Sequence, residues 1–179
     1  MKTDKSDILT LLRNSEDYIS GQQLCDRFGV TRTAVWKVIK QLKEEGYQIE
    51  SVSGRGYRLV EGPADRMSAS EIASRLKTAW AGRRLHYLDS TGSTNTDAKR
   101  LGEEGEPHGT TVVADVQTAG KGRRGRSWQT LSGTALSFTL LLRPDFGPDK
   151  ASMITLVMAL SVAEAVEEVT GVAVGIKWP

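Results

Sequence analysis

The sequence contains very little cysteine and histidine, which restricts the chemistry open to it. Cys25 is its single cysteine, and His86 and His108 are its two histidines. One cysteine excludes an internal disulfide and a cysteine-rich metal site, and two histidines make a zinc site improbable. We therefore predict no metal ligands in this chain. Cys25 lies in a helical pattern and is interpreted as a small packed residue.

Long apolar runs and a strong net charge are also lacking. No stretch approaches the length of a membrane span, and no signal-peptide pattern precedes the first polar residues. The net charge is +2, and the contents of 39% hydrophobic and 26% charged residues are ordinary for a globular protein. These features predict a cytoplasmic protein without a membrane partner. Any charged partner must therefore be bound by a local patch of charge. The length of the chain fits either one large domain or two small ones.

The first part of the sequence carries a helix-turn-helix pattern. Apolar spacing predicts a helix over residues 4–14. Ser20 and Gln23 form a capping box that begins a second helix, and Gly29 ends it before a third helix over residues 31–45. The residues predicted to face the core are Ile8, Leu11, Leu12, Leu24, Phe28, Val35, Ile39 and Leu42.

A β-hairpin is predicted directly after these helices. Residues 47–59 alternate on either side of Ser53-Gly54-Arg55-Gly56, which gives the hairpin a basic tip. Such a hairpin after a helix-turn-helix is typical of a winged helix, whose third helix contacts base edges and phosphates. The alternative is a protein-docking module, because Glu44 and Glu45 mix the charge around the third helix. The predicted DNA-binding residues are Thr31, Arg32, Thr33, Trp36, Lys37, Lys40 and Arg55.

Linker composition at residues 61–66 divides the chain. We predict a DNA-binding domain over residues 1–62, a linker over residues 63–66 and a second domain over residues 67–179. In the second domain, Ser68 and Glu71 form a capping box that predicts a helix to about Trp80. Further helices are predicted at residues 96–101 and 150–169, and strands at residues 84–88, 110–116, 135–142 and 172–177, with residues 135–142 buried on both faces.

A basic, glycine-rich loop separates two of these strands. Residues 120–126 interleave three glycines with four cations and contain no acidic residue. Glycines let a backbone approach a ligand closely, and arginines match phosphate or carboxylate oxygens with rigid N–H forks. The spacing also fits G-x-G-x-x-G, but Gly125 leads to a strand instead of a helix, so we reject a dinucleotide-binding site. A solvated loop and a second nucleic-acid contact remain as alternatives.

A small polar cluster precedes the predicted helix at residues 96–101. Residues 89–95 read Asp-Ser-Thr-Gly-Ser-Thr-Asn. Hydroxyl groups and helix-start N–H groups together can bind a neutral polar head group or an anion. An ordinary helix cap is the alternative interpretation.

These motifs together resemble the bacterial family of biotin operon repressors that are also biotin–protein ligases. The resemblance rests on the winged helix, residues 89–95, residues 117–126 and the terminal Ile176-Lys177-Trp178-Pro179, in this order and spacing. It implies an α+β protein: a winged helix-turn-helix domain, then the first part of a ligase catalytic domain with a mixed sheet, similar to class II synthetases.

The resemblance also implies an activity and partners. Members of the family activate biotin with ATP to biotinyl-5′-AMP and transfer biotin to a lysine of the biotin carboxyl carrier protein. The adenylate-bound protein forms a homodimer and binds operator DNA. The implied cofactors are biotin, ATP and Mg²⁺, with the Mg²⁺ ligands outside this sequence.

Site residues follow from the resemblance only where the motifs match. Arg123 and Lys177 are implied as catalytic cations, placed where the reacting carboxylate and phosphate meet. Lys121 stands where the family commonly has arginine, so a bidentate fork is lost there. For Trp128, a core position is the alternative. The implied biotin-binding residues are Ser93, Thr94, Asn95, Gln117, Lys121, Gly122, Arg123 and Lys177, and the implied adenylate-binding residues are Gly120, Arg124, Arg126 and Trp128.

Parts of the family pattern do not follow in this sequence. The Asn-Asp after Lys-Trp-Pro, the remaining sheet strands and a small C-terminal β-barrel are missing. We expect a fragment of a longer ligase or a truncated gene product, and little or no ligation by these 179 residues. The alternative function is a non-enzymatic winged-helix regulator that retains part of the ligase domain.

Overall fold

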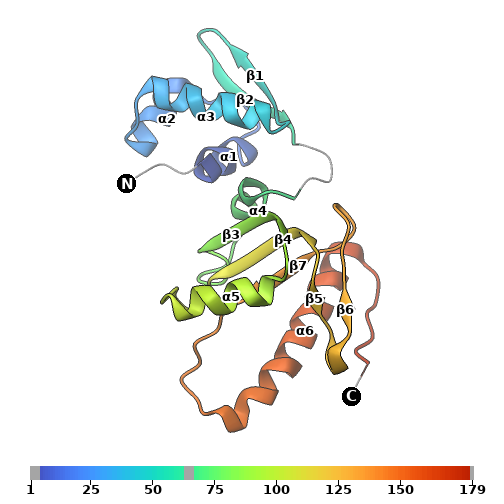
Figure 1. Ribbon diagram of the computed structural model, residues 1–179. Coiled ribbons are helices and arrows are strands. Elements are labelled where there is room, and N and C mark those ends of the chain that lie inside the picture. Colours follow the sequence, from blue (N-terminus) through green and yellow to red (C-terminus); the bar gives the residue numbers. More distant parts are fainter. Residues whose placement is uncertain (1–4, 63–66, 178–179) are drawn as a thin grey trace. The chain divides into compact units, whose positions relative to one another are not determined.

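A computed structural model describes residues 5–62 and 67–177, apart from the side chain of Arg123 (Figure 1). The predicted linker at residues 63–66 and the terminal Trp178-Pro179 lie outside the described residues. The chain divides into two units, residues 1–142 and residues 143–179, and each unit is described by itself.

The first unit begins with the predicted winged helix. Its elements are α1 (Lys5–Arg13), α2 (Gly21–Phe28), α3 (Arg32–Glu44) and an antiparallel hairpin of β1 (Gln48–Val52) and β2 (Gly56–Glu61). Two backbone hydrogen bonds of 2.9 Å between Ile19 and Tyr57 form an isolated bridge between the segment before α2 and the hairpin. The predicted order of helices and hairpin is confirmed.

Local signals begin and end these helices as the sequence predicts. Both bonds of the capping box between Ser20 and Gln23 are present at the start of α2. Gly29 ends α2 in the left-handed conformation (φ 63°), which glycine adopts without steric cost. The hydroxyl of Thr31 accepts a hydrogen bond from the Ala34 N–H and caps α3.

One apolar core holds the winged helix together. Burying each large aliphatic side chain contributes roughly 1.5–3 kcal/mol. Leu9 is fully buried, whereas Leu11, which was predicted to face the core, packs only partly against it. The two leucines flank the stripe of Ile8 and Leu12 at equal angles, so tertiary packing decides which of them is buried. The buried residues are Ile8, Leu9, Leu12, Ile19, Leu24, Val35, Ile39, Leu42, Tyr47 and Ile49.

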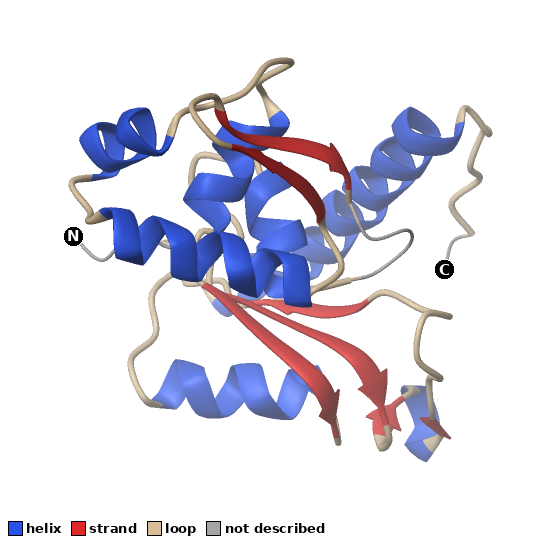
Figure 2. Ribbon diagram, turned by 90° about the horizontal axis from the view of Figure 1, so that it is seen from above, coloured by secondary structure: helices blue, strands red, loops and turns tan. Residues whose placement is uncertain are grey.

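A three-stranded mixed sheet follows in the same unit. Its order is β3 (Leu85–Thr91), β4 (Thr111–Gln117) and β7 (Ser137–Leu140), with β3 parallel to β4 and β4 antiparallel to β7. Helix α5 (Thr94–Glu103) joins the parallel pair and lies along one face of the sheet (Figure 2). The carboxyl ends of β3 and β4 therefore meet near the start of α5.

The basic loop forms a small hairpin that the sequence did not predict. Strands β5 (Gly120–Lys121) and β6 (Ser127–Trp128) pair in antiparallel fashion around a short 3-10 turn at Arg123–Gly125. Gly125 is thus followed by strand β6, whereas a dinucleotide-binding site has a helix at this point.

Three predictions for this unit are wrong in detail. Helix α4 (Ala69–Arg75) ends well before Trp80, because the backbone turns extended at Leu76. Its capping box is incomplete: the Ser68 hydroxyl caps the Glu71 N–H, but the Glu71 carboxylate binds other side chains. Strand β7 is not buried on both faces, since Phe138 is 41% exposed while α5 packs on the other face.

The second unit contains a 3-10 turn at Pro148–Lys150 and the long helix α6 (Ala151–Thr170), which ends at Gly171 in the left-handed conformation. The predicted strand at residues 172–177 is wrong: among the described residues of this unit no strand is present to pair with it, and a lone strand has no hydrogen-bonding partner. Within the described residues, no helix has the length and apolar character that crossing a membrane requires.

Candidate functional site

Gln117 and Thr94 form the centre of the candidate site. Gln117 is buried at the end of β4, and its Oε1 accepts hydrogen bonds from the Thr94 N–H (2.9 Å) and the Thr94 hydroxyl (3.1 Å). Ser93 occupies the N-cap position of α5 and is buried, but its hydroxyl makes no capping bond. Gln117 thus satisfies a helix-start N–H, which is ordinarily the task of the capping side chain. The Ser93 hydroxyl is not used as a cap.

Thr139 joins this centre from β7. Its hydroxyl lies 3.0 Å from Oγ1 of Thr94 and 2.8 Å from Oδ1 of Asn95, within hydrogen-bonding distance of both. The sequence analysis missed Thr139 because it stands within an apolar run. The available signal was the spacing of Ser137 and Thr139, two hydroxyl side chains at alternate positions in an otherwise apolar strand.

Backbone hydrogen bonds bring the two predicted motifs together. The Thr118 N–H donates to the Thr91 carbonyl (2.9 Å), and the Ala119 N–H donates to the Gly92 carbonyl (2.8 Å). The backbone N–H of Gln117 also donates to the hydroxyl of Thr130, at 2.8 Å. The segment before α5 is therefore fixed directly beside the entrance to the basic loop.

Gly120 allows Gln117 and Trp128 to approach the loop backbone. A Cβ atom at Gly120 would lie 1.9 Å from the indole of Trp128 and 2.5 Å from Nε2 of Gln117. No side chain fits in that space. Trp128 is 62% exposed, so the alternative of a core tryptophan is wrong for the described structure.

The turn of the loop has an unusual backbone. The Gly122 N–H donates to the Arg126 carbonyl at 2.7 Å and closes the turn. Arg124 has a φ of 58°, a left-handed conformation that is uncommon outside glycine. Strained conformations of this kind gather at ligand-binding segments.

The described cations of the loop point into solvent. Lys121, Arg124 and Arg126 are exposed, and within the described part of the chain none of them forms an ion pair with a carboxylate. The side chain of Arg123 lies outside the described residues. Lys177 is exposed and belongs to the second unit.

A fixed carboxylate lies on the same strand as Gln117. The hydroxyl of Ser132 and the N–H of Gly133 donate to Asp115, and these two bonds hold the pKa of its carboxyl below the usual range. Within the described residues, no group of three His, Cys, Asp or Glu side chains comes together as a metal site.

The predicted DNA-binding residues share an exposed surface of the winged helix. Thr31 also caps α3, Arg32 donates to Gln22 at 3.0 Å, and Lys40 lies over the Trp36 ring. The exposed residues of this set on α3 and its cap are Thr31, Arg32, Thr33, Trp36, Lys37 and Lys40.

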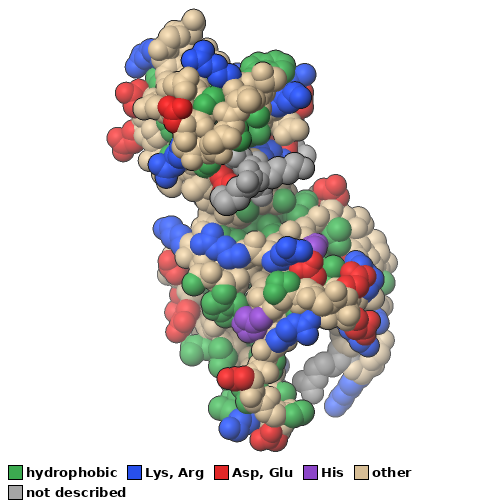
Figure 3. Space-filling view, turned by 90° about the vertical axis from the view of Figure 1, so that its left-hand side faces the viewer, with side chains coloured by type: hydrophobic (Ala, Val, Ile, Leu, Met, Phe, Trp, Pro, Cys, Tyr) green, Lys and Arg blue, Asp and Glu red, His purple; other side chains and the backbone are tan. Residues whose placement is uncertain are grey.

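At the hairpin tip, Arg55 is exposed. Its guanidinium stacks on the Tyr18 ring, 4.4 Å from the ring centroid, and pairs with Asp17 at 3.5 Å. On the face that Figure 3 shows, Lys and Arg are interspersed with Asp and Glu, so this face carries no continuous basic surface.

Comparison with known proteins identifies the family. The biotin/lipoate A/B protein ligase family matches residues 87–179, and a family described as HTH domain matches residues 5–58. The chain belongs to the biotin/lipoate A/B protein ligase family. The resemblance and the α+β fold class, a helix-turn-helix domain followed by a ligase portion, are thereby confirmed.

Relatives of this ligase family carry both parts in one chain. The bifunctional ligase/repressor BirA of Bacillus subtilis is 42% identical over 178 residues, which cover 99% of this chain and 54% of the relative. The protein of the same name from Escherichia coli K12 is 34% identical over 172 residues, 96% of this chain and 51% of the relative. The chain thus spans about half the length of these curated relatives.

Solved structures of ligases are also similar to parts of this chain. The biotin protein ligase from Aquifex aeolicus in complex with biotin and ATP is 40% identical, with a TM-score of 0.47. That likeness covers 54% of this chain and 40% of the solved one.

Proposed function

We propose that this chain carries the biotin-binding part of a biotin–protein ligase together with a DNA-binding arm that acts in repression of biotin operons. The whole protein would activate biotin with ATP to biotinyl-5′-AMP, in the presence of Mg²⁺, and pass biotin to a lysine of a carrier protein. Adenylate-bound molecules would pair as homodimers on operator DNA. We place the DNA-binding domain at residues 1–62, the linker at 63–66 and the ligase portion at 67–179.

The observation that carries this proposal is the bond pattern of Gln117 and Thr94. The ureido head group of biotin presents N–H donors and a carbonyl acceptor in one plane. Short polar side chains held in fixed positions select such a group. The hydroxyl of Ser93, which does not cap α5, and the amide of Gln117 supply an acceptor and a donor at one place. Asn95 is held at the rim by Thr139.

The loop cations give the second half of the proposed chemistry. Attack of the biotin carboxylate on the α-phosphate of ATP brings two anions together, so positioned cations lower the barrier. Lys121, Arg124 and Arg126 are exposed beside Gly120, which lies against Gln117. We assign Arg124, Arg126, Gly120 and Trp128 to the adenylate, and Arg123 and Lys177 to the reacting groups, on the family pattern.

Biotin binding is the first test. Isothermal titration of biotin into the chain, with and without Mg-ATP, would be followed by mass spectrometry for biotinyl-5′-AMP. We expect binding that Gln117→Ala weakens at least about tenfold, because two hydrogen bonds to α5 and the amide donor are lost. Gln129→Ala is the matched control, since Gln129 is an exposed glutamine of the same loop. A folded protein that gives no binding heat would contradict the proposal.

DNA binding is tested by its dependence on salt. Affinity for duplex DNA falls with salt concentration in proportion to the phosphates contacted. Arg55→Ala should reduce the slope of log K against log salt by about 1. The triple change of Lys121, Arg124 and Arg126 to alanine should leave the slope unaltered, and a lower slope would favour the alternative that the loop contacts nucleic acid. DNA binding without biotin binding would favour a non-enzymatic regulator.

A further inference from the structure

Helix α4 falls between the two family matches, which leave residues 59–86 unassigned. In the structure its seven residues pack mainly on α1 of the winged helix. The division at residues 63–66 places α4 in the ligase portion. We propose instead that α4 is part of the DNA-binding arm, and that Glu71 is the positioning residue that fixes it there. This inference rests on contacts within the first unit and holds whether or not the chain binds biotin or DNA.

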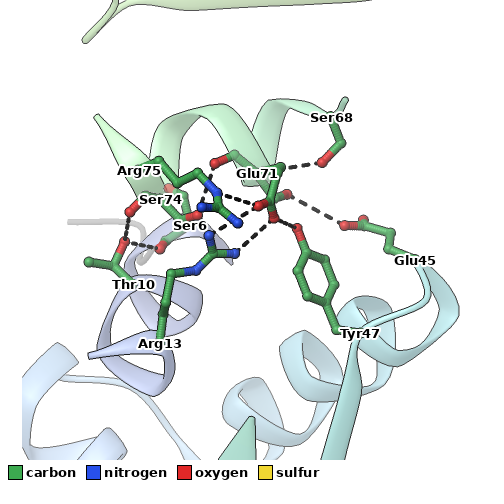
Figure 4. Close-up of polar contacts among 10 residues, drawn as sticks. Ser6, Thr10, Arg13, Glu45, Tyr47, Ser68, Glu71, Ser74 and Arg75 are labelled. Atoms are coloured by element: carbon green, nitrogen blue, oxygen red, sulfur yellow. Dashed lines mark hydrogen bonds and ion pairs between the residues drawn. The ribbon is translucent and has the colours of Figure 1, made fainter. Parts of the chain in front are cut away.

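Glu71 receives hydrogen bonds from two residues of the winged helix and from one residue of α4 itself (Figure 4). Arg13 of α1 binds both carboxylate oxygens, at 3.0 and 2.8 Å, and the Tyr47 hydroxyl donates at 2.7 Å. Arg75, one turn along α4, donates at 2.5 Å. We call Arg13, Tyr47, Glu71 and Arg75 the Glu71 cluster. Bidentate arginine–carboxylate pairs fix orientation as well as distance.

The Arg13–Glu71 pair at the centre of the Glu71 cluster is largely shielded from water. The side chains of Glu71 and Arg13 are 15% and 20% exposed, and Tyr47 is a buried residue of the winged-helix core. A charge pair in such a place is screened by salt much less than a surface pair. Burial raises the pKa of Glu71, but the bonds from Arg13, Tyr47 and Arg75 outweigh that effect and bring it to about 2.

Further polar contacts join the same two surfaces. The Thr10 hydroxyl of α1 donates to the Ser6 carbonyl at 2.7 Å and lies 3.4 Å from the Ser74 carbonyl of α4. The Ser70 hydroxyl of α4 donates to Glu45, at the end of α3, at 3.5 Å. Ser70 and Ser74 are buried. Small buried side chains let the helices approach closely, so α4 contacts the winged helix at α1 and at the end of α3.

The contact of α4 with the sheet is looser. The sheet contacts α4 less extensively than α1 does, and the Tyr87 hydroxyl of β3 donates to the Met67 carbonyl, at 2.8 Å, just before α4 begins. A groove of about 720 Å³, lined by residues that include Glu71, Arg75, Tyr87 and Asp115, lies between α4 and the sheet. On this assignment, the boundary between the arm and the ligase portion lies after α4, in residues 76–84.

A matched pair of tyrosine variants tests the assignment in the full chain by native-state hydrogen exchange. Tyr47→Phe removes the arm-side hydroxyl bond and should accelerate exchange of α4 amides about tenfold, with β4 unchanged. Tyr87→Phe removes the sheet-side bond and should leave α4 exchange within about twofold of the parent protein. The opposite ranking would overturn the proposal.

A second readout covers the case in which both tyrosine variants have small effects. Under increasing urea, the amides of α4 should share the opening free energy of α1 amides and differ from those of β3. Glu71→Gln should separate α4 from α1 in this assay. If α4 amides open together with β3 in the parent protein, α4 belongs to the ligase portion and the proposal is wrong.

Discussion

Arg13 and Glu71 form a bidentate ion pair between residues 58 positions apart in the chain. Arg13 ends α1 of the winged helix, and Glu71 lies in the first turn of α4. Because the pair is mostly shielded from water, removing one partner leaves the other charge poorly solvated. The consequences for stability depend on pH in both the acid and the alkaline range.

Glu71→Gln should destabilise the protein in an acid-sensitive way. A carboxyl whose pKa falls from 4.5 to about 2 on folding contributes stability above pH 4.5 and loses it as pH falls toward 2. The shift corresponds to at most about 3 kcal/mol. Urea denaturation should show a deficit of about 2 kcal/mol at pH 7 that shrinks below pH 4.5.

Arg75→Gln is the control for this measurement. The Arg75 side chain is 67% exposed, so its pair with Glu71 should contribute less than about 1 kcal/mol. A Glu71→Gln deficit that stays constant from pH 7 to pH 2.5 would contradict the assignment of the shift to the folded state.

Tyr47→Phe should remove an alkaline transition. Burial, the hydrogen bond to Glu71 and its charge raise the pKa of Tyr47 from 10.0 to about 12. A group with a raised pKa stabilises the fold fully below pH 10 and loses that contribution as pH rises toward 12. The free energy of unfolding should therefore fall less steeply over this range in Tyr47→Phe. In the Glu71→Gln background, the effect of Tyr47→Phe should be smaller, and equal effects would show that the two residues are not coupled.

Gly54 and Gly56 allow a matched test of the hairpin. Both have positive φ, at 79° and 113°. A Cβ at Gly54 meets nothing within 4 Å, whereas at Gly56 it would lie 2.1 Å from the Ile19 carbonyl oxygen. Gly54→Ala should cost about 1 kcal/mol from backbone strain alone, and Gly56→Ala at least about 2 kcal/mol more. Equal losses in urea denaturation would mean that the contact with Ile19 is not rigid.

Gly120→Ala should disturb the candidate site without unfolding the protein. The atoms that a Cβ would meet belong to the exposed Trp128 ring, which can rotate away, and to the Gln117 amide, whose bonds to Thr94 would be strained. We expect a shift in tryptophan fluorescence and weaker biotin binding, with a free energy of unfolding within about 1 kcal/mol of the parent. Gly175→Ala is the control, since its Cβ meets nothing within 4 Å. An unchanged fluorescence spectrum in Gly120→Ala would contradict the packing of Trp128 on Gly120.

Thr139→Val should loosen Asn95 while keeping the side-chain shape. Loss of the hydroxyl removes the bond to Asn95, which contributes roughly 0.5–1.5 kcal/mol. The side-chain amide resonances of Asn95 should move in the NMR spectrum, and biotin affinity should fall about fivefold. Thr139→Ser retains the hydroxyl and should restore both. If valine and serine behave alike, Thr139 does not position Asn95.

Local signals in the sequence determined the winged helix. The capping box at Ser20 and Gln23, the turn at Gly29 and the alternation around residues 53–56 all act within a few residues. They specify where the helices and the hairpin begin and end. The donor and acceptor of each such hydrogen bond lie within a few residues of one another, so the bond forms whatever the rest of the chain does. The motif at residues 89–95 and the basic loop could also be located this way, and the family follows from them.

Tertiary structure decided what those side chains contact. Glu71 reads as a capping residue, yet Arg13 and Tyr47 take its carboxylate, since charged and hydrogen-bonded partners in a shielded place outweigh a local cap. Gln117, at the end of β4, accepts a hydrogen bond from the helix-start N–H of α5 in place of a capping side chain. Thr139 reaches the site from β7, at the edge of the sheet. Strand pairing and helix packing set such contacts, and they depend on residues far apart in the chain, whose distances no local pattern encodes.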